Sequence, residues 1–171
     1  TTLFYKKQLY SSTRAIKKDE HLEKRVLQSA SGILTTIGGA LHENLAKKAP
    51  QQEFIALPNG YDAHLINAVE EDKDPSFFHI VYTGLLTRNQ AYPAFIQAIK
   101  YLVDKKPIRF SLAGNIPPSI IKEIKEIVPD VEVHYRGYVS HHDAIKLMKS
   151  ADLLVNFIFD GAQTEMISGK L

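Results

Sequence analysis

Residues 131–171 read VEVHYRGYVSHHDAIKLMKSADLLVNFIFDGAQTEMISGKL, and this stretch indicates the fold class. It predicts a strand over residues 131–135, a sharp turn at Gly137, a helix, and a second strand over residues 153–157. The second strand is apolar throughout, which is typical of a strand buried on both faces in the middle of a sheet. A strand, a helix and a strand in this order predict a parallel βαβ unit.

The helix and the final loop of this stretch carry its polar residues. Ser140 and Asp143 form an S-x-x-D capping box, so we expect the helix to begin there. The loop over residues 160–169 is short of apolar side chains and holds Glu165. Ligands of α/β sheets bind outside the carboxyl ends of the strands, so this loop and the turn at Gly137 are candidate binding segments.

The same alternation of strand and helix recurs upstream. We expect strands over residues 77–83 and 108–113, a helix over residues 92–103, and a further helix opened by Pro117 and Pro118. With the final stretch, this gives the order β-α-β-α-β-α-β. The sequence therefore predicts an α/β fold with a mainly parallel sheet and flanking helices.

A smaller α/β segment precedes this sheet. We expect it to contain a helix, a short strand, a second helix and a buried strand, over residues 15–30, 33–37, 40–48 and 54–57 respectively. Between residues 67 and 75 the sequence NAVEEDKDP loses its apolar period and gathers charge, which is typical of an exposed connection. We therefore expect a domain boundary near Pro75.

The composition excludes several classes of protein. The 171 residues are 44% hydrophobic and carry a formal net charge of +2, which is too small to indicate a nucleic-acid partner. Cysteine is absent, so disulfides and thiolate metal sites are excluded, and a reducing cytoplasm fits. No apolar run approaches the roughly 18 residues of a membrane span. The basic segment of residues 1–25 could attract an anionic membrane surface, or be the solvated face of a helix.

Glycines follow the expected strands of the larger sheet at one edge: Gly84, Gly114 before Asn115, and Gly137. Glycine is also what a chain needs simply to leave a strand, so this pattern has a structural explanation as well as a functional one. Arg88 lies close to Gly84, where its guanidinium could meet a diphosphate or simply face solvent.

Other common site motifs are absent from the sequence. No G-x-G-x-x-G follows a strand, and no P-loop or common hydrolase signature occurs. His141 and His142 are adjacent on a helix and point about 100° apart, so we expect no metal site there.

Several segments together resemble one family. They are LPNGYD, IVYTG, SLAGN, YRGYVSHHDAIKLMKSADLLVNF and TEMISGKL, which begin at residues 57, 80, 111, 135 and 164. In this order they resemble the retaining, nucleotide-sugar-dependent glycosyltransferases of the GT-B fold, in the family (family 4, or group 1) that builds bacterial surface polysaccharides. In that family two Rossmann-like domains face each other across a cleft, and the C-terminal domain binds the donor.

The resemblance implies a division of the chain into three parts. Residues 1–62 would be the C-terminal remnant of the acceptor-side domain, residues 63–75 an interdomain linker, and residues 76–171 a donor-binding domain that is incomplete at its C-terminus. We therefore expect a chain truncated at both ends, which is inactive by itself, from a parent that transfers sugar. The resemblance also implies a UDP- or GDP-sugar donor, a glycan, lipid-linked or other acceptor, and no essential metal or other cofactor. It implies a cytoplasmic location, at the cytoplasmic face of the inner membrane if the protein is membrane-associated.

The resemblance also assigns roles to particular residues. Tyr138 and Val139 match the segment whose backbone holds the nucleobase. Glu165 matches the first carboxylate of a Glu-seven residues-Glu motif, which contacts hydroxyls of the donor sugar. Donor-binding roles would also fall on the remaining members of the expected site, which are Gly84, Arg88, Gly114, Asn115, Gly137, Gly169 and Lys170.

The sequence departs from the family at one position. The family often has Arg directly after the glycine of the first strand of its C-terminal domain, and here Leu85 follows Gly84. Arg88 and Lys170 are then the cations expected on the departing diphosphate, and Arg88 and Glu165 are the expected catalytic residues.

Two other functions remain open at this point. The chain could be a non-catalytic nucleotide-sugar-binding subunit that needs a partner chain to complete the cleft. It could also come from a nucleotide-sugar epimerase of the same fold, although we find no carboxylate and histidine pair suited to that chemistry.

Overall fold

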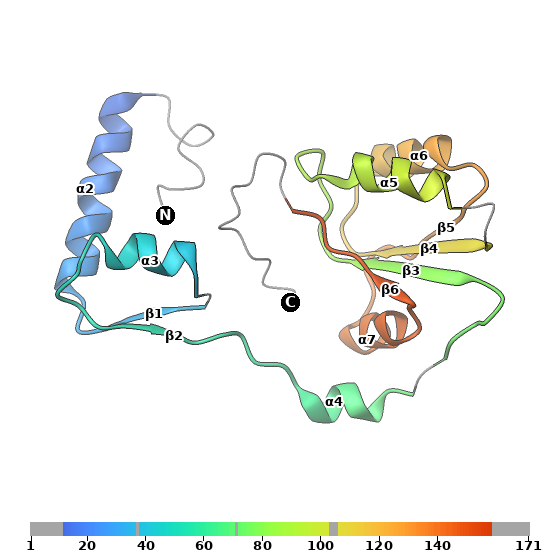
Figure 1. Cartoon of the computed structure of the whole chain (residues 1–171), viewed down its shortest axis with the longest axis horizontal. Coiled ribbons are helices and arrows are strands. Elements are labelled where there is room, and N and C mark those ends of the chain that lie inside the picture. Colours follow the sequence, from blue (N-terminus) through green and yellow to red (C-terminus); the bar gives the residue numbers. More distant parts are fainter. Residues whose placement is uncertain (1–11, 37, 71, 103–105, 159–171) are drawn as a thin grey trace. The chain divides into compact units, whose positions relative to one another are not determined.

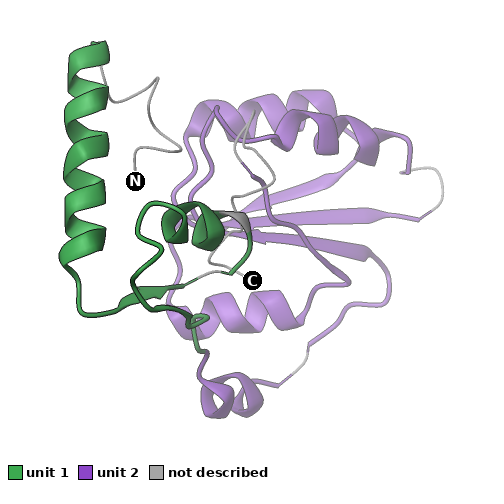
Figure 2. Cartoon of the chain, turned by 60° about the vertical axis from the view of Figure 1, so that its left-hand side comes forward, with its two compact units in different colours: residues 1–60, 162–169, 171 green, residues 61–161, 170 purple. Residues whose placement is uncertain are grey.

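The computed structural model describes two compact units of the chain (Figure 2). The first ends at Gly60 and the second begins at Tyr61. The residues that it describes are 12–36, 38–70, 72–102 and 106–158.

The described residues of the first unit form two helices and two short parallel strands. These are α2 (Thr13–Ser29), β1 (Ile33–Thr35), α3 (Ala40–Ala46) and β2 (Phe54–Ala56). Helix α2 begins at Ser12, because the Ser12 hydroxyl accepts a hydrogen bond from the backbone N–H of Ala15 at 3.2 Å. An ion pair between Lys48 and Glu23 ties the end of α3 to α2.

The core of the first unit is small. Within residues 12–36 and 38–60 it consists of three buried residues with three partly buried ones packed against them, namely Leu27, Leu45, Ala49, Ile33, Leu41 and Phe54. The expectation that the strand over residues 54–57 is buried is wrong, since Ile55 is 48% exposed and Leu57 is 59% exposed. Side chains alternate along a strand, so only the face that carries Phe54 reaches the helices.

The second unit contains a four-stranded sheet in the order β5-β4-β3-β6, with every neighbouring pair parallel (Figure 1). Its strands are β3 (Phe78–Thr83), β4 (Ile108–Ala113), β5 (Glu132–Tyr135) and β6 (Leu153–Leu154). The α/β fold class predicted from the sequence is therefore confirmed. The carboxyl ends of these strands meet at one edge, as parallel pairing requires.

Three helices connect these strands. They are α5 (Tyr92–Lys100), α6 (Pro118–Ile127) and α7 (His141–Lys149). Helix α7 begins at the expected capping residue, because the Ser140 hydroxyl accepts from the backbone N–H of Asp143 at 3.1 Å and donates to the Asp143 carboxylate at 2.6 Å. No helix in the described part of the chain is both long and apolar enough to cross a bilayer.

The two faces of this sheet differ in chemistry. One face carries apolar side chains that pack with α5 and α6 in the main core, including Tyr82, Phe110, Ile96, Ile120 and Ile124. Helix α7 lies on the opposite face (Figure 1). The strand residues that alternate with the core residues on β4 and β5 are polar: Arg109, Ser111, Glu132 and His134.

The last strand differs most from the sequence prediction. We expected a strand over residues 153–157 in the middle of the sheet, but β6 has two residues and pairs with β3 at one end of the described sheet. Leu153 is 38% exposed and Leu154 is 56% exposed, whereas Phe157 is buried against Tyr82. An apolar run shows that a segment avoids water, but it does not say which strands lie beside it.

Two further segments have features that the sequence does not predict. Helix α5 ends at Lys100 rather than near residue 103, and Leu102 is 44% exposed. The reason is a tighter final turn, since the Leu102 N–H donates to the carbonyl of Ile99. The expected linker of residues 63–75 contains a short helix, α4 (Ala63–Ala68), because the Asp62 carboxylate caps its first turn.

Candidate functional site

Three glycines lie together at the carboxyl edge of the larger sheet. The N–H of Gly114 donates to the carbonyl of Gly137 at 2.7 Å, and the N–H of Gly84 donates to the carbonyl of Ala113 at 2.8 Å. The φ angles of Gly84, Gly114 and Gly137 are 131°, 122° and 66°, in the region that disfavours side chains. A Cβ on Gly114 would lie 2.2 Å from the carbonyl oxygen of Gly84. These glycines allow the three loops that follow β3, β4 and β5 to lie side by side at this edge, with no side chain covering the backbone at the glycine positions.

The loop that follows Gly84 is held by several hydrogen bonds. The N–H of Leu86 donates to the carbonyl of Asn115 at 3.2 Å, and the Tyr82 hydroxyl donates to the carbonyl of Leu85 at 2.6 Å. The Gln90 side chain accepts from the N–H of Thr87 at 2.8 Å. The loop is therefore fixed against the neighbouring loop that begins at Gly114.

Arg88 extends from this loop and contacts α6. Its Nη1 donates to Glu123 Oε2 at 3.4 Å, and the same oxygen accepts a hydrogen bond from the Tyr92 hydroxyl at 3.2 Å. The Arg88 side chain is 65% exposed, so it stays accessible to a ligand at this edge. The predicted cation is thus present at the carboxyl edge with a carboxylate beside it.

The other described residues of the expected site lie in the same group of loops. Tyr138 is 91% exposed directly after Gly137, and Asn115 is exposed directly after Gly114. Val139 is partly buried and lines a cavity on the α7 side of the sheet. Glu165, Gly169 and Lys170 lie outside the described residues, so their roles stay predictions.

The cavity that Val139 lines has a volume of about 790 Å³. It runs from Arg136 near the carboxyl edge to Asp74 and His79 near the start of β3, beside Lys146 of α7. Its walls therefore carry both positive and negative charges. Among the described residues, no three histidine or carboxylate side chains gather as a metal site would require.

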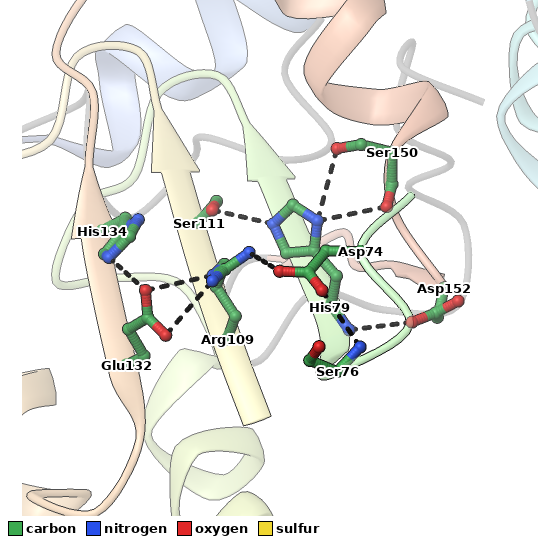
Figure 3. Close-up of polar contacts among 9 residues, drawn as sticks. All are labelled: Asp74, Ser76, His79, Arg109, Ser111, Glu132, His134, Ser150 and Asp152. Atoms are coloured by element: carbon green, nitrogen blue, oxygen red, sulfur yellow. Dashed lines mark hydrogen bonds and ion pairs between the residues drawn. The ribbon is translucent and has the colours of Figure 1, made fainter. Parts of the chain in front are cut away.

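His79 lines this cavity and is 8% exposed. Figure 3 shows its polar contacts. Its Nε2 is 2.8 Å from the Ser111 hydroxyl, and its Nδ1 is 3.1 Å from the carbonyl oxygen of Ser150. A neutral ring satisfies both contacts if Nδ1 donates and Nε2 accepts. Burial lowers the pKa of His79 below 6.5, and nearby Arg109 also lowers it, against the opposing effects of the Ser150 carbonyl and Asp152. We therefore assign a neutral structural role to this histidine.

Arg109 is the centre of a charge network on the same face (Figure 3). It donates to Asp74 at 3.0 Å and to Glu132 at 3.1 Å, and Glu132 also lies 2.8 Å from His134. Hydrogen bonds from the N–H and side chain of Ser76 lower the pKa of Asp74, and the contact with Arg109 adds to this effect. The network keeps Asp74 charged, which suits pairing rather than proton transfer.

The sequence alone does not point to the carboxylate that holds Arg88 or to the residues of this network. Glu123 lies 35 positions from Arg88, so no local pattern joins them. Arg109 did have a signal, because it is a charged residue within a strand whose other residues are all uncharged. Such a residue must find a partner on the sheet face or reach solvent.

Comparison with known proteins gives a likeness of fold. No protein-family model matches the sequence, and no curated protein matches it. Among solved structures, the chain is similar to the crystal structure of TarM, with a TM-score of 0.59, 15% sequence identity and a match that covers 86% of this chain. The match covers 29% of the TarM chain, so this chain spans less than a third of that protein. The described residues thus have a Rossmann-like α/β fold that is shared with TarM, a glycosyltransferase.

Proposed function

We propose that this chain is the donor-binding part of a glycosyltransferase and holds a nucleoside diphosphate sugar. The observation that carries the proposal is the meeting of Gly84, Gly114 and Gly137 at the carboxyl edge, with Arg88 in the adjoining loop. Bare backbone at such an edge lets a flat or phosphate-bearing ligand approach closely. The likeness of fold to a glycosyltransferase supports the same assignment.

The nucleotide would lie across the loops in a defined order. Tyr138 and Val139 would border the base, as the family resemblance implies. Tyr138 is exposed and Val139 lines the neighbouring cavity, which is compatible with this role. The diphosphate would lie near Gly84 and Gly114, within reach of the Arg88 guanidinium. Glu165 would orient the donor sugar through its hydroxyls, and Gly169 and Lys170 would border the diphosphate.

Transfer of the sugar would depend on stabilising the leaving group. A departing nucleoside diphosphate gains negative charge, and cations or N–H groups placed beside it lower the barrier. We assign this task to Arg88 and Lys170, without an essential metal. The whole protein would transfer sugar from a UDP- or GDP-sugar with retention of configuration, to an acceptor in polysaccharide or other glycan biosynthesis.

Calorimetric titration of the 171-residue chain with UDP, GDP and ADP tests this proposal. We expect one of the three nucleotides to bind and Arg88→Gln to weaken its binding about tenfold, as loss of a charge-assisted contact does. The Lys122→Gln variant is a matched control, because Lys122 is exposed on α6 and pairs with Glu126. If none of the nucleotides binds to the folded chain, the donor-site proposal is wrong.

The role of Glu165 needs a separate titration. We expect Glu165→Ala to weaken binding of the matching nucleotide sugar while binding of the bare nucleotide stays unchanged. An equal loss for both ligands would assign Glu165 to the nucleotide rather than to the sugar.

A further inference from the structure

A short chain of polar contacts leads from the core of the second unit to Arg88. The Tyr92 hydroxyl donates to Glu123 Oε2 at 3.2 Å, and Arg88 Nη1 donates to the same oxygen at 3.4 Å. Tyr92 is 2% exposed, whereas the Glu123 and Arg88 side chains are 34% and 65% exposed. The chain of contacts therefore runs from a fixed buried ring to an exposed cation.

The inner end of this chain has little freedom. The Tyr92 ring packs edge-on against Phe157, with ring centroids 6.4 Å apart. Glu123 lies on α6 directly before Ile124, which is fully buried in the core, so the backbone beneath the carboxylate is fixed. Burial and the neighbouring Glu123 both raise the pKa of Tyr92, so its hydroxyl keeps its proton and remains a donor.

The Arg88 side chain, at the outer end, has fewer accessible rotamers because of its contact with Glu123. A free arginine side chain has many rotamers, and it loses this freedom when it binds an anion, which weakens binding. Glu123 engages one terminal nitrogen of Arg88, and a guanidinium carries five N–H donors, so donors remain for a ligand. The carboxylate thus holds the cation without using all of its hydrogen-bonding capacity.

We propose that Glu123 and Tyr92 are positioning residues, which hold the Arg88 guanidinium at the carboxyl edge so that it is ready to bind a diphosphate. This inference rests on the proposed donor site. Positioning and charge repulsion predict opposite effects of Glu123 on the affinity for a diphosphate. Glu123 is negative and lies near the expected diphosphate, so repulsion alone predicts that neutralising Glu123 tightens binding, whereas positioning predicts that it weakens binding.

Calorimetry with Glu123→Gln separates these alternatives. We expect the nucleoside diphosphate to bind about three- to tenfold more weakly, as the loss of preorganisation in one long side chain predicts, and the nucleoside without phosphates to bind unchanged. Tyr92→Phe should weaken the same ligand in the same direction, by a smaller factor. Glu126→Gln is the matched control, because it makes the same charge change on the same helix, where Glu126 pairs with Lys122.

A second background tests whether the effect acts through Arg88. In Arg88→Gln protein, adding Glu123→Gln should produce no further loss of diphosphate affinity.

Tighter binding of the diphosphate by the Glu123→Gln variant would overturn the inference, because it would show that Glu123 competes with the diphosphate for Arg88. Equal weakening of nucleoside and nucleoside diphosphate would overturn it in favour of a general structural role. If wild-type chain binds none of the nucleotides, the proposed function fails and this inference fails with it, whereas binding without dependence on Glu123 overturns the inference alone.

Discussion

At the scale of the residue, Gly114 has very little room for a side chain. Its φ of 122° and the backbone of Gly84 beside it leave no space for a side chain. Gly137 also has a positive φ, but nothing lies within 4 Å of a Cβ built there. A substitution at Gly137 therefore measures backbone strain alone, whereas one at Gly114 measures strain together with steric overlap.

We predict that Gly114→Ala destabilises the chain by about 3 kcal/mol or more, since strain and overlap with fixed backbone add. Gly137→Ala should cost only about 1 kcal/mol, the usual penalty of the left-handed region. Urea unfolding followed by circular dichroism measures both variants. Equal losses would show that the loop of Gly84 moves aside readily, contrary to the hydrogen bonds that hold it.

The lowered pKa of His79 predicts that the free energy of unfolding depends on pH. Its pKa in the folded chain is below 6.5, so between that lower pKa and 6.5 the unfolded chain binds more protons than the folded chain. The stabilising effect of the neutral ring is thus fully present above pH 6.5 and is lost as the pH falls through the folded pKa. NMR titration of the His79 ring should give a midpoint below 6.5.

Urea unfolding at several pH values provides the matching stability measurement. His79→Gln removes this titration, so the free energy of unfolding of the variant should fall less steeply than that of the wild type as the pH falls below 6.5. Parallel curves for the two proteins would contradict the assignment of a neutral, buried ring.

At the scale of the element, helix α4 depends on α7. Lys149 of α7 donates to the carbonyl oxygens of Ile66, at 3.2 Å, and Val69. A helix of six residues is too short to be stable alone, so its carbonyls need such a partner. The charge of Lys149 also suits the negative end of α4.

We predict that Lys149→Met increases amide hydrogen exchange in α4 about tenfold, since a charge-assisted contact to its last turn is lost. Exchange in β3 and β4 should not change, because their core is on the other face of the sheet. Lys146→Met is the control, as Lys146 is exposed on the same helix. Unchanged exchange in α4 would mean that Lys149 does not hold it.

At the scale of the whole molecule, the described residues form two separate cores. In this part of the chain the core of the second unit has seventeen buried residues and that of the first has three, so we expect the second unit to be the more stable. Ile124 is fully buried in the larger core.

We predict that Ile124→Ala destabilises the second unit by about 2–5 kcal/mol through the cavity that it leaves. Native-state hydrogen exchange should show lower protection of β3 and β4 and unchanged protection of α2. Lys125→Ala, an exposed change on the same helix, is the control. A matching loss of protection in α2 would show that the two cores unfold as one.

The fold class could be predicted from the sequence because its signals are local. Alternating strands and helices, Ser140 before α7 and the glycines after three strands are all patterns within a few residues, and each agrees with the described structure. The position of β6 could not be predicted, since an apolar run is compatible with either a middle or an outer place in a sheet.

The candidate site divides in the same way. The sequence by itself determined that glycines and Arg88 follow parallel strands, because strand direction alone brings their carboxyl ends to one edge. Only the tertiary structure decided that Glu123 and Tyr92 meet at Arg88, and that Asp74, Arg109 and Glu132 pair across the opposite face. The physical reason is that such pairs form between residues far apart in the chain, whose proximity depends on how helices pack on the sheet rather than on any local period.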